Sequence, residues 1–266
     1  MGAWFRGMFE ASGIHVDIVE YDTALEERNR LLAQASSVMC AVPIAQAVEV
    51  ASQLVPRLRS DALLFDITSI KEPIGRAMAA HSGEVVGTHP MCAPTSEGLV
   101  SQRVVWCAER LGHRAQALRC WFDDQRAMVV EFSSERHDRL MAVVQALNHF
   151  QSIVFAHTLG ALGLDVHETM SVASPVYSLR MQLMGRILAQ DPALYVDIEL
   201  QNKYVPEMLS VLQGSASRFH QAIIGGDRER CLEFFTEASE TFGSFAKEAK
   251  ERSDQVLGFV ARAVKK

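Results

Sequence analysis

Short apolar runs alternate with amphipathic segments through the first half of the chain. The runs carry few polar residues, whereas the segments between them repeat apolar positions every three or four residues, as helices do. We expect strands at residues 16–20, 38–42, 62–66, 84–87, 104–107 and 128–132, and helices at 3–11, 25–35, 45–58 and 115–122. Near-continuous apolar strands separated by helices are typical of a parallel sheet covered on both faces. The first half is therefore predicted to be an α/β domain.

After Ser134 the strand pattern stops and long helical periods replace it. Apolar residues recur at helical spacing over several turns, at Leu140, Val143, Leu147, Phe150 and Val154. The pattern also predicts a last helix over 228–263. We therefore expect two domains, an α/β domain at 1–133 and an all-helical domain at 134–266.

Polar side chains follow two of the predicted strands at the point where each strand ends. Asp66 ends one strand and is followed by Ser69 and Lys71, and the next strand ends in Thr88 and His89. In an open α/β sheet, ligands bind at the edge formed by the carboxyl ends of the strands. We therefore expect Ser69, Lys71 and His89 to share a catalytic crevice, although Ser69 also suits a helix cap and Lys71 a solvated first turn.

Charge and cysteine content narrow the class of protein. The chain has 266 residues, a formal net charge of −6 and a pI near 5.9. This acidic balance argues against a nucleic-acid partner, because such partners bind basic surfaces. The five cysteines are odd in number and lack C-x-x-C spacing, so we expect neither disulfides nor zinc and place the protein in the reducing cytoplasm. No apolar run reaches the roughly 18 residues of a membrane span, so no membrane association is expected.

The start of the chain carries part of a dinucleotide-binding pattern. The expected strand at 16–20 ends in Glu20, where such folds use an acidic residue to hold the adenosine ribose hydroxyls. A carboxylate there would repel a 2′-phosphate and so favour NAD over NADP. Gly2 precedes an expected helix and fits the last glycine of a phosphate-binding turn. The earlier glycines and the first strand are not in the sequence, so we expect the coding sequence to continue upstream with them.

Short segments of the chain occur together in a characteristic order. They are MGAWFRGMFEASG at 1–13, AVPI at 41–44, DITSIK at 66–71, THPM at 88–91, VVWC at 104–107, HDRLMAVVQALNHF at 137–150, SPVYSL at 174–179 and GRILAQDPALYVDI at 185–198. They resemble the prephenate dehydrogenases of the tyrosine pathway, in particular the dehydrogenase part of the enteric bifunctional chorismate mutase/prephenate dehydrogenases. The resemblance implies a Rossmann-type domain and a helical domain that forms homodimers. It also implies the NAD-dependent oxidative decarboxylation of a small anionic cyclohexadienyl substrate.

The resemblance assigns roles to individual residues. His89 corresponds to the catalytic histidine that hydrogen-bonds the ring hydroxyl, and Ser69 to the serine that hydrogen-bonds this histidine. Arg186, within an apolar run, would bind a substrate carboxylate from a buried or cleft-facing position. Further residues expected near the substrate are three from one helix and one beside the catalytic histidine: His137, Gln145, His149 and Cys92. No metal site is expected, and the residues expected at the cofactor are Gly2, Glu20, Val42, Pro43, Thr68 and Ser69.

Two departures from the enteric pattern leave the substrate open. The enteric enzymes continue the THPM segment with Phe-Gly-Pro, whereas this chain has Cys92, Ala93 and Pro94. They also carry an arginine after the tyrosine of S-P-x-Y, where this chain has Ser178 and an arginine only two residues later, on another helix face. Prephenate is therefore the first expectation, 4-amino-4-deoxyprephenate is the alternative, and arogenate stays open. A non-catalytic dimeric protein with a lost phosphate loop is the alternative of a different class.

Overall fold

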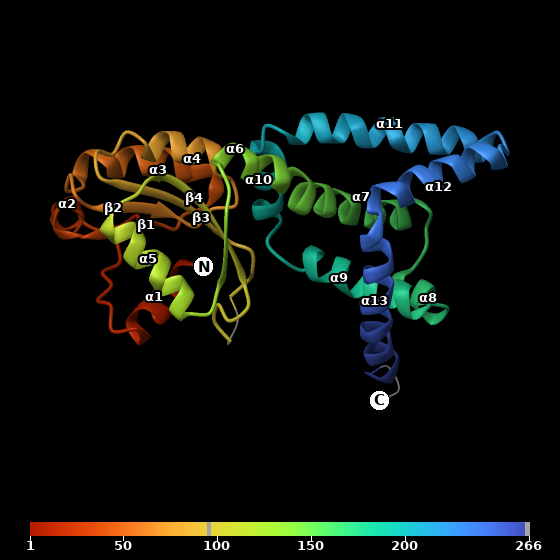
Figure 1. The fold of residues 1–266 in the computed structure, drawn as a ribbon, viewed down its shortest axis with the longest axis horizontal. Helices are drawn as coiled ribbons and strands as arrows, with labels where there is room; N and C mark the ends of the chain where they lie inside the picture. Colours follow the sequence, from red (N-terminus) through yellow and green to blue (C-terminus); the bar gives the residue numbers. More distant parts are fainter. Residues whose placement is uncertain (95–96, 264–266) are drawn as a thin grey trace. The chain divides into compact units, whose positions relative to one another are not determined.

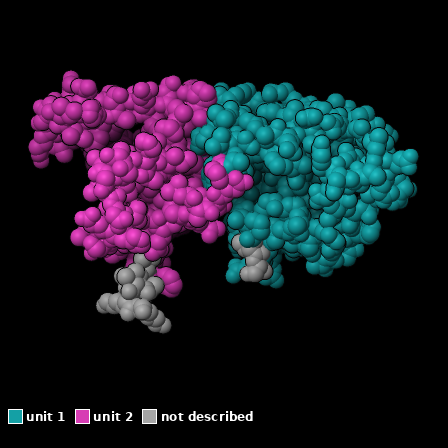
Figure 2. Space-filling model, turned by 180° about the vertical axis from the view of Figure 1, so that it is seen from behind, with its two compact units in different colours: residues 1–145, 193–204 teal, residues 146–192, 205–266 magenta. Residues whose placement is uncertain are grey.

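The computed structural model describes residues 1–94 and 97–263 (Figure 1). The chain forms two compact units, which Figure 2 draws in different colours. The first contains residues 1–145 and 193–204, and the second contains residues 146–192 and the chain from Val205 onward. The expected boundary at 133–134 coincides with Ser133, the N-cap of a helix, while the first unit continues beyond it. The boundary between the two domains at 133–134 stays a prediction.

The first unit is built on a five-stranded sheet with the order β1-β2-β3-β4-β5. The strands are β1 (Ser37–Cys40), β2 (Leu63–Asp66), β3 (Glu84–Pro90), β4 (Arg103–Arg110) and β5 (Met128–Glu131). The sheet is parallel as expected, except that β4 runs antiparallel to β3. The connection between β3 and β4 contains no helix among its described residues. Without a crossover helix, the chain returns in the opposite direction.

Alternate residues of the buried strands feed two separate cores, one on each face of the sheet. The helices of this unit are α1 (Gly2–Ala11), α2 (Leu25–Gln34), α3 (Ile44–Leu54), α4 (Glu72–Met78), α5 (His113–Asp124), α6 (Ser134–Met141) and α10 (Pro192–Gln201). Leu63 and Phe65 of β2 pack in the core that contains α1 and α5, whereas Leu64 packs in the core that contains α3 and α4. Figure 1 shows these two pairs of helices on opposite faces of the sheet. Successive side chains of a strand point to opposite faces of the sheet. Both faces of this sheet are therefore covered.

Residues 16–20 do not form the expected strand. They lie in a segment without regular structure, and Ile18 is 42% exposed. An extended segment becomes a strand only when a neighbouring backbone completes its hydrogen bonds, and none of the described strands pairs with this one. Glu20 therefore does not end a strand. Its backbone N–H donates to the Thr23 hydroxyl, and its carbonyl accepts from Arg28.

The second unit is helical throughout the part that the structure describes. Its helices are α7 (Asn148–Ala161), α8 (Val166–Ser171), α9 (Pro175–Leu188), α11 (Val205–Ile224), α12 (Arg228–Phe242) and α13 (Ser244–Ala263). Helices α7 and α13 pack on α9, and α12 packs along α11. The expectation of one last helix over 228–263 is wrong, because Gly243 interrupts it with a φ of +51°. Glycine adopts this left-handed conformation at little cost.

The long helix expected across residues 137–150 is not regular. A π-helical stretch at Ala142–Leu147 separates α6 from α7. A π-helical turn changes the angular phase of the residues that follow it, and such turns are frequent at functional sites.

Among the residues that the structure describes, no helix combines the length and the apolar character needed to cross a lipid bilayer.

Candidate active site

The carboxyl ends of β2 and β3 lie side by side, because the two strands pair in parallel with Asp66 opposite Gly87. His89 lies just beyond Gly87 on β3 and is only 3% exposed. Its Nδ1 is 2.8 Å from Nε2 of His137, and its Nε2 is 3.4 Å from Nε2 of Gln145. Two side chains expected near the substrate therefore meet at the histidine expected to be catalytic.

Gln145 reaches His89 from the π-helical stretch. Its amide nitrogen lies at the long end of hydrogen-bond distance from His89. Its Oε1 is buried and accepts no hydrogen bond from the described residues. A buried acceptor without a donor lowers stability. This amide is therefore well placed to bind a polar group of a ligand next to the imidazole.

His137 connects His89 to the start of α4 through Asp138. Nδ1 of His137 is 2.7 Å from Oδ1 of Asp138. The two carboxylate oxygens of Asp138 accept hydrogen bonds from the backbone N–H groups of Lys71, at 2.8 Å, and Glu72, at 2.9 Å. The free N–H groups and the dipole at a helix N-terminus favour a negative charge there. The side chain of Asp138 is thus held in place behind the two histidines.

Lys71 is an internal residue, so its alternative as a solvated first-turn lysine is wrong. Its side chain and that of Asp66 are both fully buried and form an ion pair. The Lys71 ammonium also donates to the carbonyl oxygen of Thr88 at 2.7 Å. The backbone N–H of Thr68 donates to Asp66 at 2.8 Å. This pair ties the end of β2 to the residue directly before His89.

The two histidines are in an environment that disfavours their charged forms. Burial, followed by the charges of His137 and Lys71, holds the pKa of His89 well below its usual range. Burial also lowers the pKa of His137, and the hydrogen bond to Asp138 partly offsets this effect. Both imidazoles are therefore neutral near neutral pH. A neutral imidazole has one nitrogen that can accept a proton or a hydrogen bond.

The residues expected at the cofactor occupy different environments. A Cβ atom at Gly2 would lie 3.3 Å from Cβ of Ala41, so the start of α1 approaches the loop after β1 closely. Val42 and Pro43 lie on this loop, and Pro43 is the N-cap of α3. The hydroxyl of Thr68 is instead used inside the protein, at 2.6 Å from Asp66. Glu20, whose side chain is exposed, belongs to the irregular segment described above.

The other expected residues occupy several different environments. Ser69 is half-buried, but no hydrogen bond joins it to His89, whose two ring nitrogens have other partners. Cys92 is half-buried after β3, and burial raises the pKa of its thiol. Arg186 is exposed on α9 of the second unit, which does not match the buried position considered for it. His149 is buried on α7 of the same unit, and burial lowers its pKa.

Sequence reasoning missed Asp138, which organises the group. Its position directly after His137 in the first turns of a helix was the available signal, but nothing in the sequence shows that the start of α4 lies against it. Asn202, whose side-chain nitrogen donates to the carbonyl of Asp138 at 2.8 Å, was missed for the same reason. Both contacts join residues far apart in the chain.

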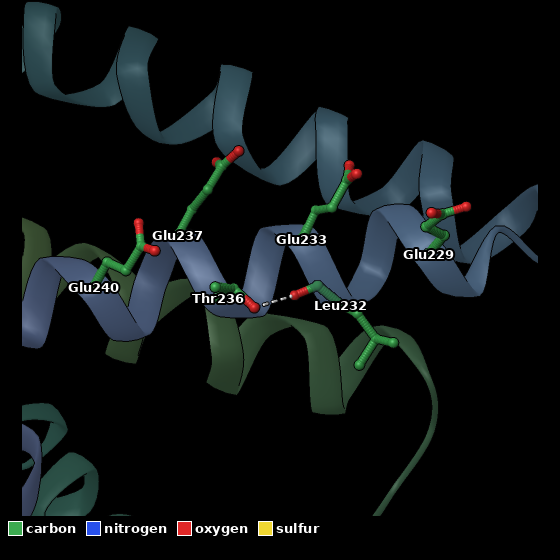
Figure 3. Close-up of a pocket in the computed structure, with 6 residues that line it drawn as sticks. All are labelled: Glu229, Leu232, Glu233, Thr236, Glu237 and Glu240. Carbon is green, nitrogen blue, oxygen red and sulfur yellow. Dashed lines mark hydrogen bonds between the residues drawn. The ribbon is translucent and has the colours of Figure 1, made fainter.

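A different surface hollow lies on α12 of the second unit. It has a volume of about 410 Å³, and four glutamates contribute to its lining. Figure 3 shows Glu233 and Glu237 pointing to one side of α12 and Leu232 to the other. Glu237 forms an exposed ion pair with Arg218 of α11 at 2.9 Å. Nothing in this hollow resembles the buried, connected group around His89, so the candidate site is the one in the first unit.

Comparisons with known proteins agree with the order of the two units. Residues 15–106 match the family model of the prephenate dehydrogenase nucleotide-binding domain. Residues 133–237 match the model of the prephenate dehydrogenase dimerization domain. Among solved structures, prephenate dehydrogenase from Aquifex aeolicus in complex with hydroxyphenyl propionate and NAD⁺ has a TM-score of 0.71, with 21% identity over 91% of this chain and 93% of that one. Synechocystis arogenate dehydrogenase has a TM-score of 0.69, with 15% identity over 92% of this chain and 96% of that one. At these identities the likeness shows the fold.

Three curated relatives are more similar in sequence. A probable arogenate/prephenate dehydrogenase of Methanocaldococcus jannaschii is 31% identical over 100% of this chain. The T-protein of Enterobacter agglomerans is 33% identical over 97% of this chain. The 4-amino-4-deoxyprephenate dehydrogenase of Streptomyces pristinaespiralis is 32% identical over 91% of this chain. The chain spans 64%, 69% and 82% of the lengths of these relatives, respectively. With both domain models matched in order, the chain belongs to the prephenate dehydrogenase family.

Proposed function

We propose that the protein catalyses the NAD-dependent oxidative decarboxylation of prephenate to 4-hydroxyphenylpyruvate. The observation that carries this proposal is His89, a buried neutral imidazole at the carboxyl edge of the sheet. Its Nε2 faces the half-satisfied amide of Gln145. Such an imidazole suits a reaction that needs a hydrogen-bond acceptor for a ring hydroxyl. Family membership supports the reaction type.

The reaction requires few groups from the protein. The ring carbon that carries the hydroxyl loses a hydride, and this hydroxyl becomes a carbonyl as its hydrogen bond to His89 strengthens. The bond to the ring carboxylate then breaks, carbon dioxide leaves, and its electron pair makes the ring aromatic. The proton that His89 took from the hydroxyl returns to this oxygen, which is thereby converted to the phenol. A neutral His89 supports this sequence because it can attract the hydroxyl proton without first losing one of its own.

The chain offers a close backbone approach where a dinucleotide would bind. The start of α1 at Gly2 lies against the loop that contains Val42 and Pro43, and a larger residue than glycine would crowd it. A helix N-terminus of this kind favours a pyrophosphate. These residues therefore fit NAD⁺, which when bound supplies the hydride acceptor. The proposed cofactor agrees with the NAD⁺ complex of the Aquifex relative.

Carboxylate recognition is assigned to Arg186. Its side chain is exposed on α9, and no salt bridge to a described residue occupies its guanidinium. The nearby Arg180 is used differently, because its guanidinium lies 4.9 Å from the ring centroid of Phe155 in the same unit. Arg186 is thus the arginine of this helix that remains available for a bidentate contact with a carboxylate.

A second candidate substrate is 4-amino-4-deoxyprephenate. The Streptomyces relative that carries this name is 32% identical, close to the value for the T-protein. An ammonium has only donors, and Gln145 Oε1 and His89 Nε2 offer two acceptors close together. A hydroxyl would instead use one donor and one acceptor, which the same amide can match after rotation. Prephenate stays the first choice because the similarity to the T-protein extends over 97% of this chain. The segments that resemble the enteric prephenate dehydrogenases are spread over the same length.

The test is NADH formation by the purified chain with prephenate, arogenate and 4-amino-4-deoxyprephenate in parallel. We expect prephenate to give the largest kcat/KM, with carbon dioxide released in equal amount. A preference of roughly tenfold or more for the amino compound, equal to about 1.4 kcal/mol, would replace prephenate with that substrate. Absence of turnover with all three, together with failure to bind NAD⁺, would support the non-catalytic alternative with a lost phosphate loop.

We also propose that the second unit forms a homodimer. Residues 133–237, which include its helices α7, α8, α9 and α11, match a dimerization domain. Large apolar side chains are exposed on several of its helices: Val211, Ile223, Ile224, Leu232, Phe235, Phe245 and Phe259. Exposed apolar surface of this extent marks an interaction site. Sedimentation equilibrium is expected to give twice the chain mass of 29.5 kDa, and a monomer at micromolar concentration would contradict the proposal.

A further inference from the structure

The hydrogen bonds behind His89 form a chain with a defined direction. It begins at backbone N–H groups of Lys71 and Glu72, which can only donate, so both oxygens of Asp138 must accept. Oδ1 of Asp138 also accepts from His137, so Nδ1 of His137 carries the hydrogen. The backbone of α4 therefore sets the protonation pattern of the side chains that follow.

The same direction continues to His89. A neutral His137 with its hydrogen on Nδ1 has a lone pair on Nε2. This nitrogen lies 2.8 Å from Nδ1 of His89, so His89 must donate its Nδ1–H to it. The lone pair of His89 is then on Nε2, the nitrogen that faces Gln145. Reversal of any one bond would leave two donors or two acceptors facing each other.

Burial keeps this arrangement intact. His137 is 0% exposed and Asp138 is 2% exposed, so water does not offer an alternative partner. Both nitrogens of His137 are engaged inside the protein, which leaves none for the direct substrate contact that the resemblance implied. The amide of Asn202 holds the backbone carbonyl of Asp138 from the other side. His137 and Asp138 are thus held in place behind His89.

We infer that His137 and Asp138 are positioning residues that fix the tautomer and orientation of His89, so that its Nε2 is always the acceptor presented to the substrate. The kinetic consequence of this inference rests on the proposed function. The tautomer itself does not, because it is a property of the protein without substrate. Without the pair, His89 could carry its hydrogen on Nε2, and that nitrogen could no longer accept one.

The first experiment measures the tautomer directly. Nitrogen NMR of the full chain with ¹⁵N-labelled histidine distinguishes protonated from unprotonated ring nitrogens, and loss of signals in His89→Asn assigns that residue. At neutral pH we expect Nδ1 of His89 to be protonated and Nε2 to be unprotonated. An Nε2–H tautomer of His89 in the unaltered protein would overturn the inference, whether or not the protein turns over any substrate.

The second experiment replaces His137 in two ways. His137→Phe keeps the ring shape but removes the acceptor, whereas His137→Gln places an amide oxygen near the former Nε2. We expect His137→Phe to lower kcat by roughly 10²-fold, within the range for acid–base groups, with little change in the KM values for NAD⁺ and substrate. His137→Gln should restore most of kcat and retain the Nδ1–H signal of His89. Equal kcat values for the two variants would overturn the positioning role.

Controls separate positioning from loss of fold. His113 has a side chain that is 79% exposed at the start of α5, so His113→Phe and His113→Gln should leave kcat unchanged. Circular dichroism and the melting temperature check that both His137 variants are folded. In a His89→Asn background, His137→Phe should cause no further loss of kcat, because the two residues act as one unit. A full additional 10²-fold loss there would contradict action through His89.

Discussion

The first unit buries its polar chemistry, whereas the second unit leaves much of its apolar surface uncovered. In the first, the side chains of His89, His137 and Lys71 are at most 3% exposed, and each is hydrogen-bonded within the unit. In the second, Phe235 and Ile224 are 72% and 70% exposed. The contacts of the proposed catalytic histidine are thus complete within one chain, whereas the exposed apolar side chains of the helical unit fit the proposed interface with a second chain.

The largest effect is expected for substitution of His89, the proposed catalytic residue. His89→Asn removes the Nε2 acceptor but keeps a polar side chain of similar shape. We expect kcat to fall by roughly 10²–10⁴-fold, the usual contribution of a general acid–base group. Affinity for NAD⁺ should change little, because the proposed cofactor loop does not include this residue. Initial rates of NADH formation and a separate titration with NAD⁺ measure the two quantities.

The control for this substitution is His81, which is also a buried histidine of the first unit. Its Nε2 is 2.9 Å from the backbone carbonyl oxygen of Ala62. His81→Asn is expected to lower stability but not the kcat of the folded fraction. A His89→Asn enzyme with unaltered kcat would remove this residue from the mechanism.

The buried ion pair between Lys71 and Asp66 predicts a large effect on the free energy of unfolding. Lys71→Met leaves the carboxylate of Asp66 buried without its cation, and breaking such a pair costs about 3–5 kcal/mol. Urea unfolding monitored by fluorescence measures this loss. Lys250 and Asp254 form a matched surface pair with side chains 77% and 60% exposed, and Lys250→Met should change stability by less than about 1 kcal/mol. Equal effects of the two substitutions would show that the Lys71 pair is not desolvated in solution.

The sequence predicts the sheet well because its strands are buried on both faces. Every residue of β2 and β3 is buried, and the apolar stretches within them, 63–65 and 85–86, are visible without knowledge of their neighbours. Residues 16–20 show the same pattern but form no strand, because a strand also depends on a partner that a local pattern does not reveal. Gly243 could have been read as a helix break, but a single glycine is also tolerated inside helices.

The sequence predicts the position of His89, but it does not predict the hydrogen bonds that surround this residue. The polar ends of two strands and the family motifs both point to His89. The pairing of His137 with His89 joins residues separated by a strand, a helix and another strand, and no periodicity encodes it. The π-helical turn that aims Gln145 is equally invisible, because the local residues have ordinary helical character. Lys71 was ambiguous because burial of a lysine depends on the distant groups that pair with it.

The proposed carboxylate contact of Arg186 predicts an intermediate effect. Arg186→Ala removes a charge-assisted hydrogen bond worth about 1.5–3 kcal/mol. We expect the KM for substrate to rise by roughly 10- to 100-fold with a smaller change in kcat, as steady-state kinetics will show. Arg186→Lys should recover only part of the affinity, since an ammonium cannot form a bidentate contact. Arg252, 75% exposed on α13, supplies the control, and an unchanged KM in Arg186→Ala would make Arg186 structural.

The uncovered helices predict a concentration-dependent effect. Phe235→Asp places a charge on an apolar position of α12 that is 72% exposed in the single chain. If a partner chain covers this surface, burial of the new carboxylate without a cation weakens the dimer. Sedimentation velocity across a dilution series should show dissociation at higher concentration than for the unaltered chain. Leu111→Asp, at a residue 61% exposed in the first unit, should leave the association unchanged, and equal behaviour of both variants would place the interface elsewhere.

The smallest effect is the pH dependence of stability that follows from the two buried histidines. Burial holds the pKa values of His89 and His137 below those of the unfolded chain. As pH falls through the ordinary histidine value of about 6.5, the unfolded chain binds protons that the folded protein does not, so stability decreases. Each unit of lowered pKa corresponds to about 1.4 kcal/mol once the pH is below both values. Urea unfolding between neutral and mildly acidic pH should therefore show falling stability, with a smaller slope in His89→Asn. An identical slope in that variant would mean that His89 is protonated in the folded protein as readily as in the unfolded chain, which is incompatible with a buried neutral acceptor.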